Sequence, residues 1–417
     1  MTQAQFDFEQ AWASSIPARW RWTRNKELLA ESQDVSFDGS EELLSVSHLT
    51  GITPKSEKNV TMTAAENLDG YRLVDTGDLV INTMWAWMGA LGVARQPGLV
   101  SPAYGVYSPR PEAPFNPAFY DYLYRSTPYV MEMTRLSRGI WSSRLRLYPD
   151  AFLRMAIPVP PLEEQRAIAE YLDRETAHID TLIEEQQRLI EMLRERRRVL
   201  VTRAVCFGVD EGVELRDCGD PVVGLVPRHW TVKAVRYWLE SLDGQRIPLS
   251  GEERADRRGD FDYYGASGVI DQVDGYLFDE PLVLVSEDGA NLLMRSTPIA
   301  FAAKGRYWVN NHAHVLRPLN DGDVDFWAQR LEALDVTTVV SGATQPKLTA
   351  GALMGLRVSA PDDVDEQRRI AEYLAAQTSK IDMLIVESER FVELSRERRA
   401  ALITAAVTGQ IDVREMV

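Results

Sequence analysis

The sequence has few cysteines, no long hydrophobic run and no surplus of positive charge. Its two cysteines, Cys206 and Cys218, are too few for a disulfide framework and lack the Cys-x-x-Cys spacing of a zinc site. No stretch approaches the ~18 apolar residues that a membrane span needs, and the first residues do not form a signal-peptide pattern. These absences predict a cytoplasmic protein with no membrane contact.

Positive charge is scarce, because 46 Lys and Arg residues face 62 Asp and Glu residues, which gives a net charge of -16. A simple nucleic-acid-binding protein usually carries a basic surplus, so the overall charge argues against one. Residues 133–149 and 290–320 depart from this balance, since they contain no acid but several basic and aromatic residues. A charge run is more often a solvated face. One such stretch in each half of the chain nevertheless suits two nucleic-acid contact faces on an acidic body.

Catalytic motifs are also missing. The tetrapeptide Asn-Pro-Ala-Phe at residues 116–119 approaches the Asn-Pro-Pro-Phe motif of adenine methyltransferases, but no glycine-rich cofactor loop precedes it, and a helix N-terminus explains it better. His312 and His314 would share a strand face, yet no carboxylate or cysteine at a suitable spacing completes a metal site. Neither a phosphate-binding loop nor a Gly-x-Ser-x-Gly elbow occurs. We therefore predict a chain without catalytic activity.

The sequence does contain a long internal repeat. Residues 164–205 return without a gap as residues 366–407, with about 24 of 42 positions identical. Both copies begin with Glu-Gln-Arg and carry Arg-Glu-Arg-Arg near their end. A repeat of this length indicates one structural plan used twice.

Each copy has the pattern of an amphipathic helix. Apolar residues recur at spacings of three and four, and neither Gly nor Pro occurs from Leu162 to Phe207 or from Val364 to Thr408. Each run would extend roughly 60 Å at about 1.5 Å per residue, with a possible bend near residues 173–176, where the apolar phase shifts. A single stripe is best explained by a long core helix. Two near-identical stripes around a domain-sized insertion favour helices that pair as a coiled coil.

Two segments with short strand patterns, broken by Gly and Pro, alternate with these helices. Both open with Pro-x-x-Trp, at residues 17–20 and 227–230. The first ends in Pro-Pro-Leu-Glu-Glu-Gln at residues 160–165, where prolines stop a strand and acids start a helix. The predicted division is a first α+β domain (1–160), a first spacer helix (161–207), a second α+β domain (208–360), a second spacer helix (361–410) and a tail (411–417).

Together these features resemble the specificity subunit of type I restriction-modification systems. The resemblance rests on the Pro-x-x-Trp openings, the Ser-Gly-Ala-Thr-Gln segment at residues 341–345, the junction at residues 160–165 and the repeated helix. It implies two globular α+β target-recognition domains separated by two long helices that form an antiparallel coiled coil with pseudo-two-fold symmetry. The first domain departs from the pattern, because Arg-Gly-Ile-Trp-Ser-Ser at residues 138–143 stands where the second has residues 341–345.

The resemblance implies a non-catalytic DNA reader, in which each recognition domain binds one half of a split site. Successive major-groove faces on one side of a duplex lie about 34 Å apart, so two readers need a rigid spacer of that scale. The implied partners are double-stranded DNA, two methyltransferase (modification) subunits and, where present, restriction subunits. S-adenosylmethionine and ATP with Mg would bind to the partner subunits, with no cofactor or metal on this chain. Those subunits would also supply phosphate-binding charge that this acidic chain lacks.

Candidate base contacts follow from side-chain chemistry, since Arg and Lys suit guanine edges whereas Asn and Gln suit adenine. In the first domain the candidates are Arg95, Arg135, Arg138, Ser142 and Arg144. In the second they are Arg295, Lys304, Arg306, Asn310, Asn311, Gln345 and Lys347. For any one of them, a phosphate contact or a surface salt bridge explains the residue about as well.

Two other classes of protein remain as alternatives. The first is a coiled-coil scaffold that holds two protein-binding domains and makes no direct DNA contact. The second is a self-sufficient methyltransferase, for which the sequence offers little. Binding of random duplex that falls steeply with salt would distinguish a DNA reader from the scaffold.

Overall fold

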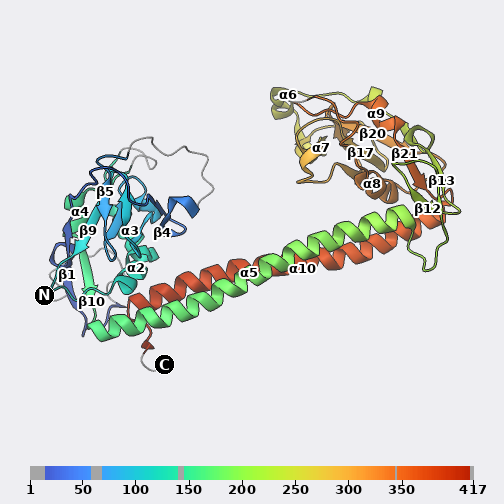
Figure 1. Cartoon of the computed structure of the whole chain (residues 1–417). Helices are drawn as coiled ribbons and strands as arrows, with labels where there is room; N and C mark the ends of the chain where they lie inside the picture. Colours follow the sequence, from blue (N-terminus) through green and yellow to red (C-terminus); the bar gives the residue numbers. More distant parts are fainter. Residues whose placement is uncertain (1–14, 58–67, 140–144, 343–344, 414–417) are drawn as a thin grey trace. The chain divides into compact units, whose positions relative to one another are not determined.

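The computed structural model of the chain describes residues 15–57, 68–139, 145–342 and 345–413. The chain forms two compact units, Met1–Gln187 with Arg390–Val417, and Arg188–Glu389. Each unit contains one globular α+β domain and one half of each long helix (Figure 1). No helix in the described residues is both long enough and apolar enough to cross a membrane.

The two long helices are α5 (Leu162–Phe207) and α10 (Val364–Val407), which follow the repeat. They contain 46 and 44 residues, and α5 continues as a helix through residues 173–176, the position at which the shift in apolar phase allows a bend. The apolar phase shifts there because Thr176 faces the first domain. Tyr122 Oη lies 3.1 Å from Thr176 Oγ1 and donates a hydrogen bond to Asp173 Oδ1 at 2.8 Å. Contact with a domain therefore changes the buried face without ending the helix.

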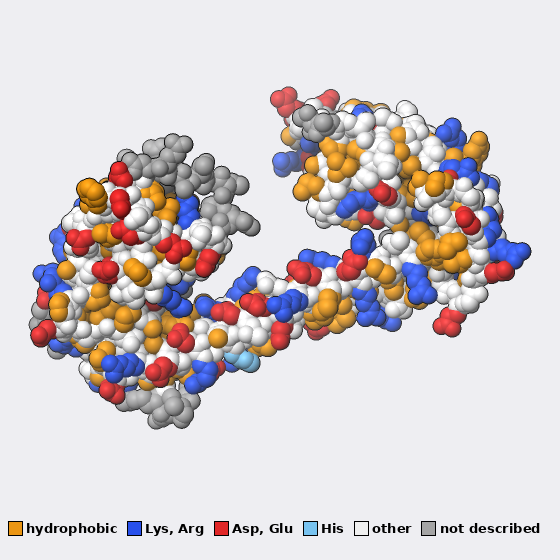
Figure 2. Space-filling view, in the orientation of Figure 1, with side chains coloured by type: hydrophobic (Ala, Val, Ile, Leu, Met, Phe, Trp, Pro, Cys, Tyr) orange, Lys and Arg blue, Asp and Glu red, His pale blue; other side chains and the backbone are white. Residues whose placement is uncertain are grey.

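The two helices pack against each other within each unit through an apolar seam. In the first unit, Ile179 and Ile183 of α5 pack against Val392 of α10. The second unit buries Ile190 of α5 and Ile381 of α10. Acidic and basic side chains are interspersed over the outside of the helices (Figure 2). This pattern confirms the predicted coiled coil.

One ion pair occurs twice and fixes the antiparallel register. In the first unit, Arg399 Nε lies 2.9 Å from Asp180 Oδ1. In the second unit, Arg197 Nε donates to Asp382 Oδ1 at 2.8 Å. Arg197 and Arg399 occupy the same position of the repeat, as do the two aspartates, so each copy supplies the arginine once and the aspartate once. Both pairs are partly exposed and contribute at most about 1 kcal/mol each, so they define the register more than they stabilise it.

The first domain is built around an antiparallel sheet of order β2-β9-β6-β7, with the two-stranded pairs β1-β10, β3-β4 and β5-β8 beside it. Its elements are β1 (Arg21–Arg24), α1 (Asn25–Leu28), β2 (Leu29–Glu31), β3 (Leu44–Ser47), β4 (Gly51–Pro54), β5 (Arg72–Val74), β6 (Leu79–Asn82), β7 (Leu91–Val93), β8 (Gly98–Val100), β9 (Tyr104–Pro109), α2 (Pro117–Arg125), α3 (Thr127–Leu136), α4 (Pro149–Arg154) and β10 (Ala156–Val159). Its core includes Ile168 and Leu172 from α5 and Ala406 and Val407 from α10. The helix ends are thus part of the domain.

The second domain is built around an antiparallel sheet of order β14-β20-β17-β18, so both central sheets connect their strands in the same order. Its elements are β11 (Leu215–Asp217), β12 (Leu225–Pro227), β13 (Thr231–Ala234), β14 (Leu239–Ser241), η7 (Asp243–Gln245), α6 (Gly251–Asp256), β15 (Arg258–Gly265), β16 (Gly268–Val273), β17 (Leu282–Ser286), α7 (Asn291–Met294), β18 (Ala300–Ala303), β19 (Tyr307–Val309), β20 (Ala313–Pro318), α8 (Val324–Glu332), α9 (Ala350–Gly355) and β21 (Arg357–Ala360). Val201 and Val205 of α5 and Ile370 and Leu374 of α10 complete its core.

A buried glutamine at the start of α5 joins the helix to the first domain. Gln165 Nε2 donates to the carbonyl oxygens of Pro114 and Pro160, both at 2.9 Å, and its Oε1 accepts from Asn116 N at 2.9 Å. Asn116 Oδ1 in turn accepts from Phe119 N at 2.9 Å and caps α2. The Asn-Pro-Ala-Phe segment is therefore a helix N-terminus, as predicted.

The second copy repeats this junction with other partners. Gln367 Nε2 donates to Pro361 O at 2.9 Å, and its Oε1 accepts from Asp323 N at 3.0 Å. Asp323 caps α8, which occupies the place of α2. The glutamine of the Glu-Gln-Arg motif therefore attaches each long helix to the domain that precedes it.

Candidate nucleic-acid interface

In the second domain, a surface loop folds back onto the end of the central strand. Glu287 directly follows β17, and residues 341–348, here called the second closing loop, return to it. Ser341 and Lys347 exchange backbone hydrogen bonds of 2.9 and 2.7 Å, and Leu348 N donates to Glu287 O at 2.8 Å. The loop is thus closed on itself and anchored to the sheet.

Side chains of residues 345–348 alternate between solvent and the interior. Gln345 and Lys347, both predicted contacts, are exposed, whereas Pro346 and Leu348 are buried. Gly342 has a φ of +90°, and a Cβ there would lie 2.4 Å from the carbonyl oxygen of Gln345. The turn therefore requires glycine at this position.

In the first domain, residues 138–147, here called the first closing loop, are anchored in the same way at their described ends. Arg138 and Arg146 exchange backbone hydrogen bonds of 2.9 and 3.0 Å, and Leu147 N donates to Thr83 O at 3.0 Å. Thr83 directly follows β6, as Glu287 follows β17. Two predicted contacts in this loop, Ser142 and Arg144, lie outside the described residues.

Two other predicted contacts of the first domain lie at the first closing loop and on α3. Arg138 is exposed, with its Nη2 3.5 Å from Asp150 Oδ2. Arg135 donates two charge-assisted hydrogen bonds to Glu132, at 2.6 and 2.9 Å, on the same turn of α3. A DNA contact by Arg135 would thus compete with a close local ion pair.

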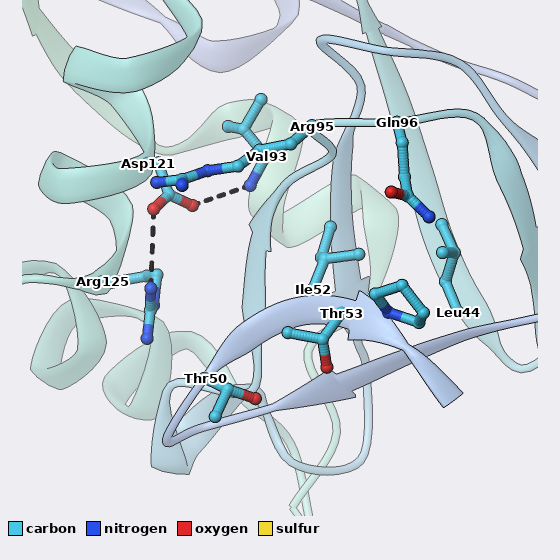
Figure 3. A pocket seen from close by; sticks show the side chains of 10 residues that line it. Leu44, Thr50, Ile52, Thr53, Val93, Arg95, Gln96, Asp121 and Arg125 are labelled. Atoms are coloured by element: carbon cyan, nitrogen blue, oxygen red, sulfur yellow. Dashed lines mark hydrogen bonds and ion pairs between the residues drawn. The ribbon is translucent and has the colours of Figure 1, made fainter. Parts of the chain in front are cut away.

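Arg95 lies at the opposite end of the central sheet, in a pocket between the β3-β4 hairpin, the turn after β7 and α2 (Figure 3). Val93 of β7 pairs with Leu79, the first residue of β6, whereas the closing loop is anchored beyond the last. Asp121 accepts a hydrogen bond from Val93 N at 2.8 Å, and the Arg95 side chain points toward this carboxylate. The structure therefore does not bring Arg95 together with the first closing loop.

Four charged side chains beneath the second closing loop form a group with Lys347 of the loop itself, here called the charged cluster: Asp243, Arg246, Glu287, His314 and Lys347. Glu287 accepts from Arg246 Nη1 at 2.7 Å and lies 3.1 Å from Lys347 Nζ. Asp243 Oδ2 is 3.4 Å from Arg246 Nη2 and 2.6 Å from His314 Nδ1. The cluster joins η7, β20, the end of β17 and the loop into one network.

The cluster shifts the pKa of three of its members. Burial alone would lower the pKa of His314, but its hydrogen bonds to Asp243 and to the Leu348 carbonyl raise it above the ordinary value. Burial alone would raise the pKa of Asp243 and Glu287. Hydrogen bonds from His314 to Asp243, and from Arg246 and Lys347 to Glu287, lower both instead. The cluster therefore favours two carboxylates and three cations.

Asp243, Glu287 and His314 offer ligand atoms within 4.8 Å of one another, a spacing that could hold a metal ion. The donor set argues for a different arrangement. Arg246 and Lys347 already pair with Glu287, and both ring nitrogens of His314 are engaged, with Asp243 and with the Leu348 carbonyl. These residues fit an ion-pair network better than a metal site.

The turn between β19 and β20 brings further predicted residues to the same end of the sheet, because Ala313 of β20 pairs with the last residue of β17. Asn311 is exposed there, and its carbonyl oxygen lies 3.4 Å from Arg246 Nη1. Asn310 is only 5% exposed, and its Oδ1 accepts from His312 N at 2.8 Å. Asn310 therefore shapes the turn, whereas Asn311 faces solvent beside the closing loop.

The remaining basic candidates lie elsewhere. Arg295, half-buried, donates to the carbonyl oxygens of Glu332 and Leu334, which satisfies the C-terminal end of α8. Lys304 and Arg306 follow β18, whose last residue pairs with the first residue of β17. Their ion-pair partners, Asp325 and Asp279, lie 2.7 and 3.0 Å away. The acid-free run of residues 290–320 is therefore divided between the two ends of the sheet and is not one face.

Two basic residues near the closing loops were not among the predicted contacts. Arg146 closes the first loop at the position where Lys347 closes the second. Extending the comparison of the two loops by three residues would have identified it. Arg246 lies about forty residues before its partner Glu287, so no local pattern indicates their contact.

A second surface feature of this unit is a groove along the last turns of α5, here called the apolar groove. Its apolar lining residues are Met192, Val199, Leu200, Ala204, Phe207, Val209, Val213, Leu215 and Tyr373. Met192 and Val199 are 62% and 54% exposed although they lie on a helix that pairs on its other face. Exposed apolar groups in a groove are typical of protein-binding surfaces.

Comparison with known proteins identifies relatives for parts of the chain. The sequence model of the type I restriction modification DNA specificity domain matches residues 227–385. The chain is 30% identical over 138 residues to the putative type I restriction enzyme specificity subunit S.HindORF215P of Haemophilus influenzae, covering 33% of this chain and 34% of that protein. It is 22% identical over 179 residues to the type I restriction enzyme EcoDI specificity subunit of Escherichia coli, covering 42% and 38%. The matches span little more than a third of these relatives.

Two solved structures share the fold. One belongs to a study of complex assembly and conformational transition of the type I R-M system, with a TM-score of 0.69, 16% identity and coverage of 95% of this chain and 99% of that chain. The other is the HsdS subunit of Thermoanaerobacter tengcongensis, with a TM-score of 0.54, 16% identity and coverage of 95% and 98%. Residues 227–385 thus match the type I restriction-modification DNA specificity domain, and the chain shares its fold with the HsdS subunit of Thermoanaerobacter tengcongensis.

Proposed function

We propose that this chain is the DNA sequence-specificity subunit of a type I restriction-modification complex, in which each domain reads one half of a bipartite site. The observation that carries the proposal is the pair of closing loops. Both are anchored to the residue that follows the second strand of the central sheet, and both are closed by a basic residue, Arg146 or Lys347. The two loops are anchored to the sheet in the same way while their sequences differ, which suits two domains that read different bases.

The proposed contacts on the second half-site are Asn311, Gln345 and Lys347, which are exposed at one end of the sheet. Those on the first half-site are Arg138 and Arg146, together with Ser142 and Arg144. The other predicted contacts, Arg95, Arg135, Arg295, Lys304, Arg306 and Asn310, remain predictions. Four of them form local ion pairs that a DNA contact would have to replace.

In the proposed complex, α5 and α10 set the spacing between the half-sites. Both are uninterrupted over more than forty residues, and their mutual register is fixed by the repeated Arg–Asp pair. A rod of helices is stiff over this length, so a change in its length would be transmitted to the domains.

We further propose that the apolar groove receives a methyltransferase (modification) subunit, because its exposed Met192 and Val199 suit a protein partner. Two such subunits and, where present, restriction subunits would complete the complex on double-stranded DNA. S-adenosylmethionine and ATP with Mg would be bound by those partners. The partner subunits would also offset the net charge of -16 of this chain where the complex meets the DNA phosphates.

Mapping adenine methylation across the genome of cells with and without this chain tests the proposed function. The expected result is one split motif that is methylated only when the chain is present. Loss of the chain without any change in methylation would contradict the proposal. Duplex binding by the chain and its methyltransferase partner that does not fall as salt rises would favour the scaffold alternative.

Lys347→Ala is expected to weaken recognition of the second half-site, and Arg146→Ala that of the first. If the side chain contacts a base, the loss of discrimination is about 1–3 kcal/mol and is confined to one half-site. Binding is measured by titration of duplexes in which only one half-site is changed at a time. Lys304→Ala, at the other end of the second sheet, serves as comparison. An equal loss of second-half-site recognition in Lys304→Ala would mean that the DNA contact has been assigned to the wrong end of the sheet.

A further inference from the structure

A histidine lies buried directly beneath the second closing loop and uses both of its ring nitrogens. His314 is on β20, and its side chain is 1% exposed. Its Nδ1 lies 2.6 Å from Asp243 Oδ2, and its Nε2 lies 2.8 Å from the carbonyl oxygen of Leu348. The ring therefore connects η7, on one side, to the last residue of the loop, on the other.

The hydrogen-bond partners determine the protonation of this ring. The carbonyl oxygen of Leu348 can only accept, so Nε2 of His314 must carry a proton. Asp243 Oδ1 accepts from Val315 N at 2.8 Å, and Arg246 lies beside Oδ2, so this side chain is an ionised acceptor as well. Nδ1 must then also carry a proton. The geometry specifies a buried imidazolium ion.

We propose that His314, as an imidazolium, is a positioning residue that holds the second closing loop in place for DNA reading, and that its deprotonation at higher pH weakens recognition of the second half-site alone. A neutral imidazole has one donor and one acceptor, so it would place a lone pair against one of the two oxygens. Either the Asp243 contact or the Leu348 contact is then lost. The inference rests on the proposed function of the closing loops.

Within the charged cluster, the proposed pH dependence is assigned to His314. Asp243 and Glu287 contact it from η7 and from the end of β17, and Arg246 and Lys347 neutralise these carboxylates. The lowered pKa values of Asp243 and Glu287 keep both carboxylates ionised throughout the neutral range. The raised pKa of His314 means that its contribution is present at low pH and disappears as the pH rises above its ordinary value of about 6.5. Outside the cluster, exposed His312 pairs with Asp288 at 2.8 Å and needs a separate control.

The first domain provides an internal control. Gly105 of β9 pairs with Ile81 of β6 at the position where His314 of β20 pairs with Val285 of β17. The space beside Gly105 is filled by the ring of Tyr107, 2.8 Å from where a Cβ would lie. The first closing loop is therefore anchored without a histidine, and recognition of the first half-site should not depend on pH in this range.

The contacts of His314 with Asp243 and with the Leu348 carbonyl, here called the clamp, can be tested on the full-length chain without DNA. The chain has five histidines, so NMR titration of isotope-labelled histidine, with His314→Gln for assignment, resolves each ring. Hydrogen exchange of the peptide covering residues 341–348, corrected for the intrinsic rate, is compared between about pH 6 and about pH 9. We expect protection that decreases with pH by at most about tenfold per unit. His314→Gln should lack the pH dependence and show low protection throughout.

Asp243→Asn distinguishes a proton-dependent clamp from simple packing. The amide group can donate to Nδ1 of a neutral ring, which then keeps Nε2–H for the Leu348 carbonyl. We therefore expect this variant to retain protection of the loop at about pH 9, where the wild type loses it. A His314 ring that titrates like the exposed histidines, or loop protection independent of pH in the wild type, would overturn the inference.

Binding of a duplex that carries the mapped split motif then tests the link to DNA reading. In the wild type and in His312→Gln, discrimination against duplexes changed in the second half-site should fall as the pH rises. In Asp243→Asn it should not fall. Discrimination against changes in the first half-site should stay unaffected by pH. Specific binding that is independent of pH in both half-sites would overturn the positioning role. A pH-dependent loop in a chain that binds no DNA would instead overturn the proposed function and leave the clamp itself intact.

Discussion

Deletion of residues 185–188 from the middle of α5 is expected to change the gap between the two methylated half-sites or to abolish methylation, with both domains still folded. Four residues correspond to about 6 Å of helix and little more than one turn, so the apolar seam stays nearly in phase. The Arg197–Asp382 and Arg399–Asp180 pairs cannot then both form, because they share one antiparallel register. One half of α5 must slide along α10. Genome-wide mapping of methylated adenine gives the new gap directly.

The matched control replaces the same four residues by alanine, which keeps the length and register of α5. Methylation should then retain the original gap, since three of the four side chains are exposed and only Gln186 is half-buried. Hydrogen exchange in the two domain cores checks that both remain folded in the deletion variant. If the deletion leaves the gap and the extent of methylation unchanged, the helices do not set the spacing.

Gln367→Glu is expected to destabilise the second unit by about 2–4 kcal/mol. The amide of Gln367 is 3% exposed and donates to the Pro361 carbonyl at 2.9 Å. A carboxylate of the same shape has no proton to donate, so two oxygens would face each other in a buried site. Denaturant titration followed by hydrogen exchange in peptides of residues 188–389 measures the loss.

Two matched variants show where the effect originates. Gln165→Glu removes the equivalent donor from the first unit, where it serves two carbonyl oxygens, and should destabilise residues 1–187 instead. Gln187→Glu changes an exposed side chain on the same helix and should have almost no effect. A loss of similar size in all three variants would indicate a general effect of added negative charge on the helices.

The long helices could be predicted because their signal is strong and local. Each run has more than forty residues without Gly or Pro and apolar spacings of three and four, which predicts a helix. The repeat indicates that the two helices pair. The repeat also contains the register, since Arg197 and Arg399, with Asp180 and Asp382, can form two equivalent pairs only if the helices are antiparallel. The domains share no such pattern, and their common strand order emerges only from the three-dimensional structure.

The candidate site was predicted less completely because closeness in sequence does not imply closeness in an antiparallel sheet. Successive turns in such a sheet lie at alternate ends, which separates Lys304 and Arg306 from Asn311 although only a few residues intervene. The charged cluster is the opposite case. Asp243 and His314 lie 71 residues apart in sequence, so no spacing rule for metal or catalytic motifs could join them.

The alternation within the second closing loop bears on how new target sequences arise. Pro346 and Leu348 point inward and secure the loop, whereas Gln345 and Lys347 point outward and contribute no burial. Exchange of Gln345 therefore leaves the folding free energy almost untouched, whereas exchange of Lys347 also removes its ion pair with Glu287. Under the proposed function, a lineage can acquire a different half-site through a few such replacements, and the other half-site, the helices and the partner subunits need not adapt.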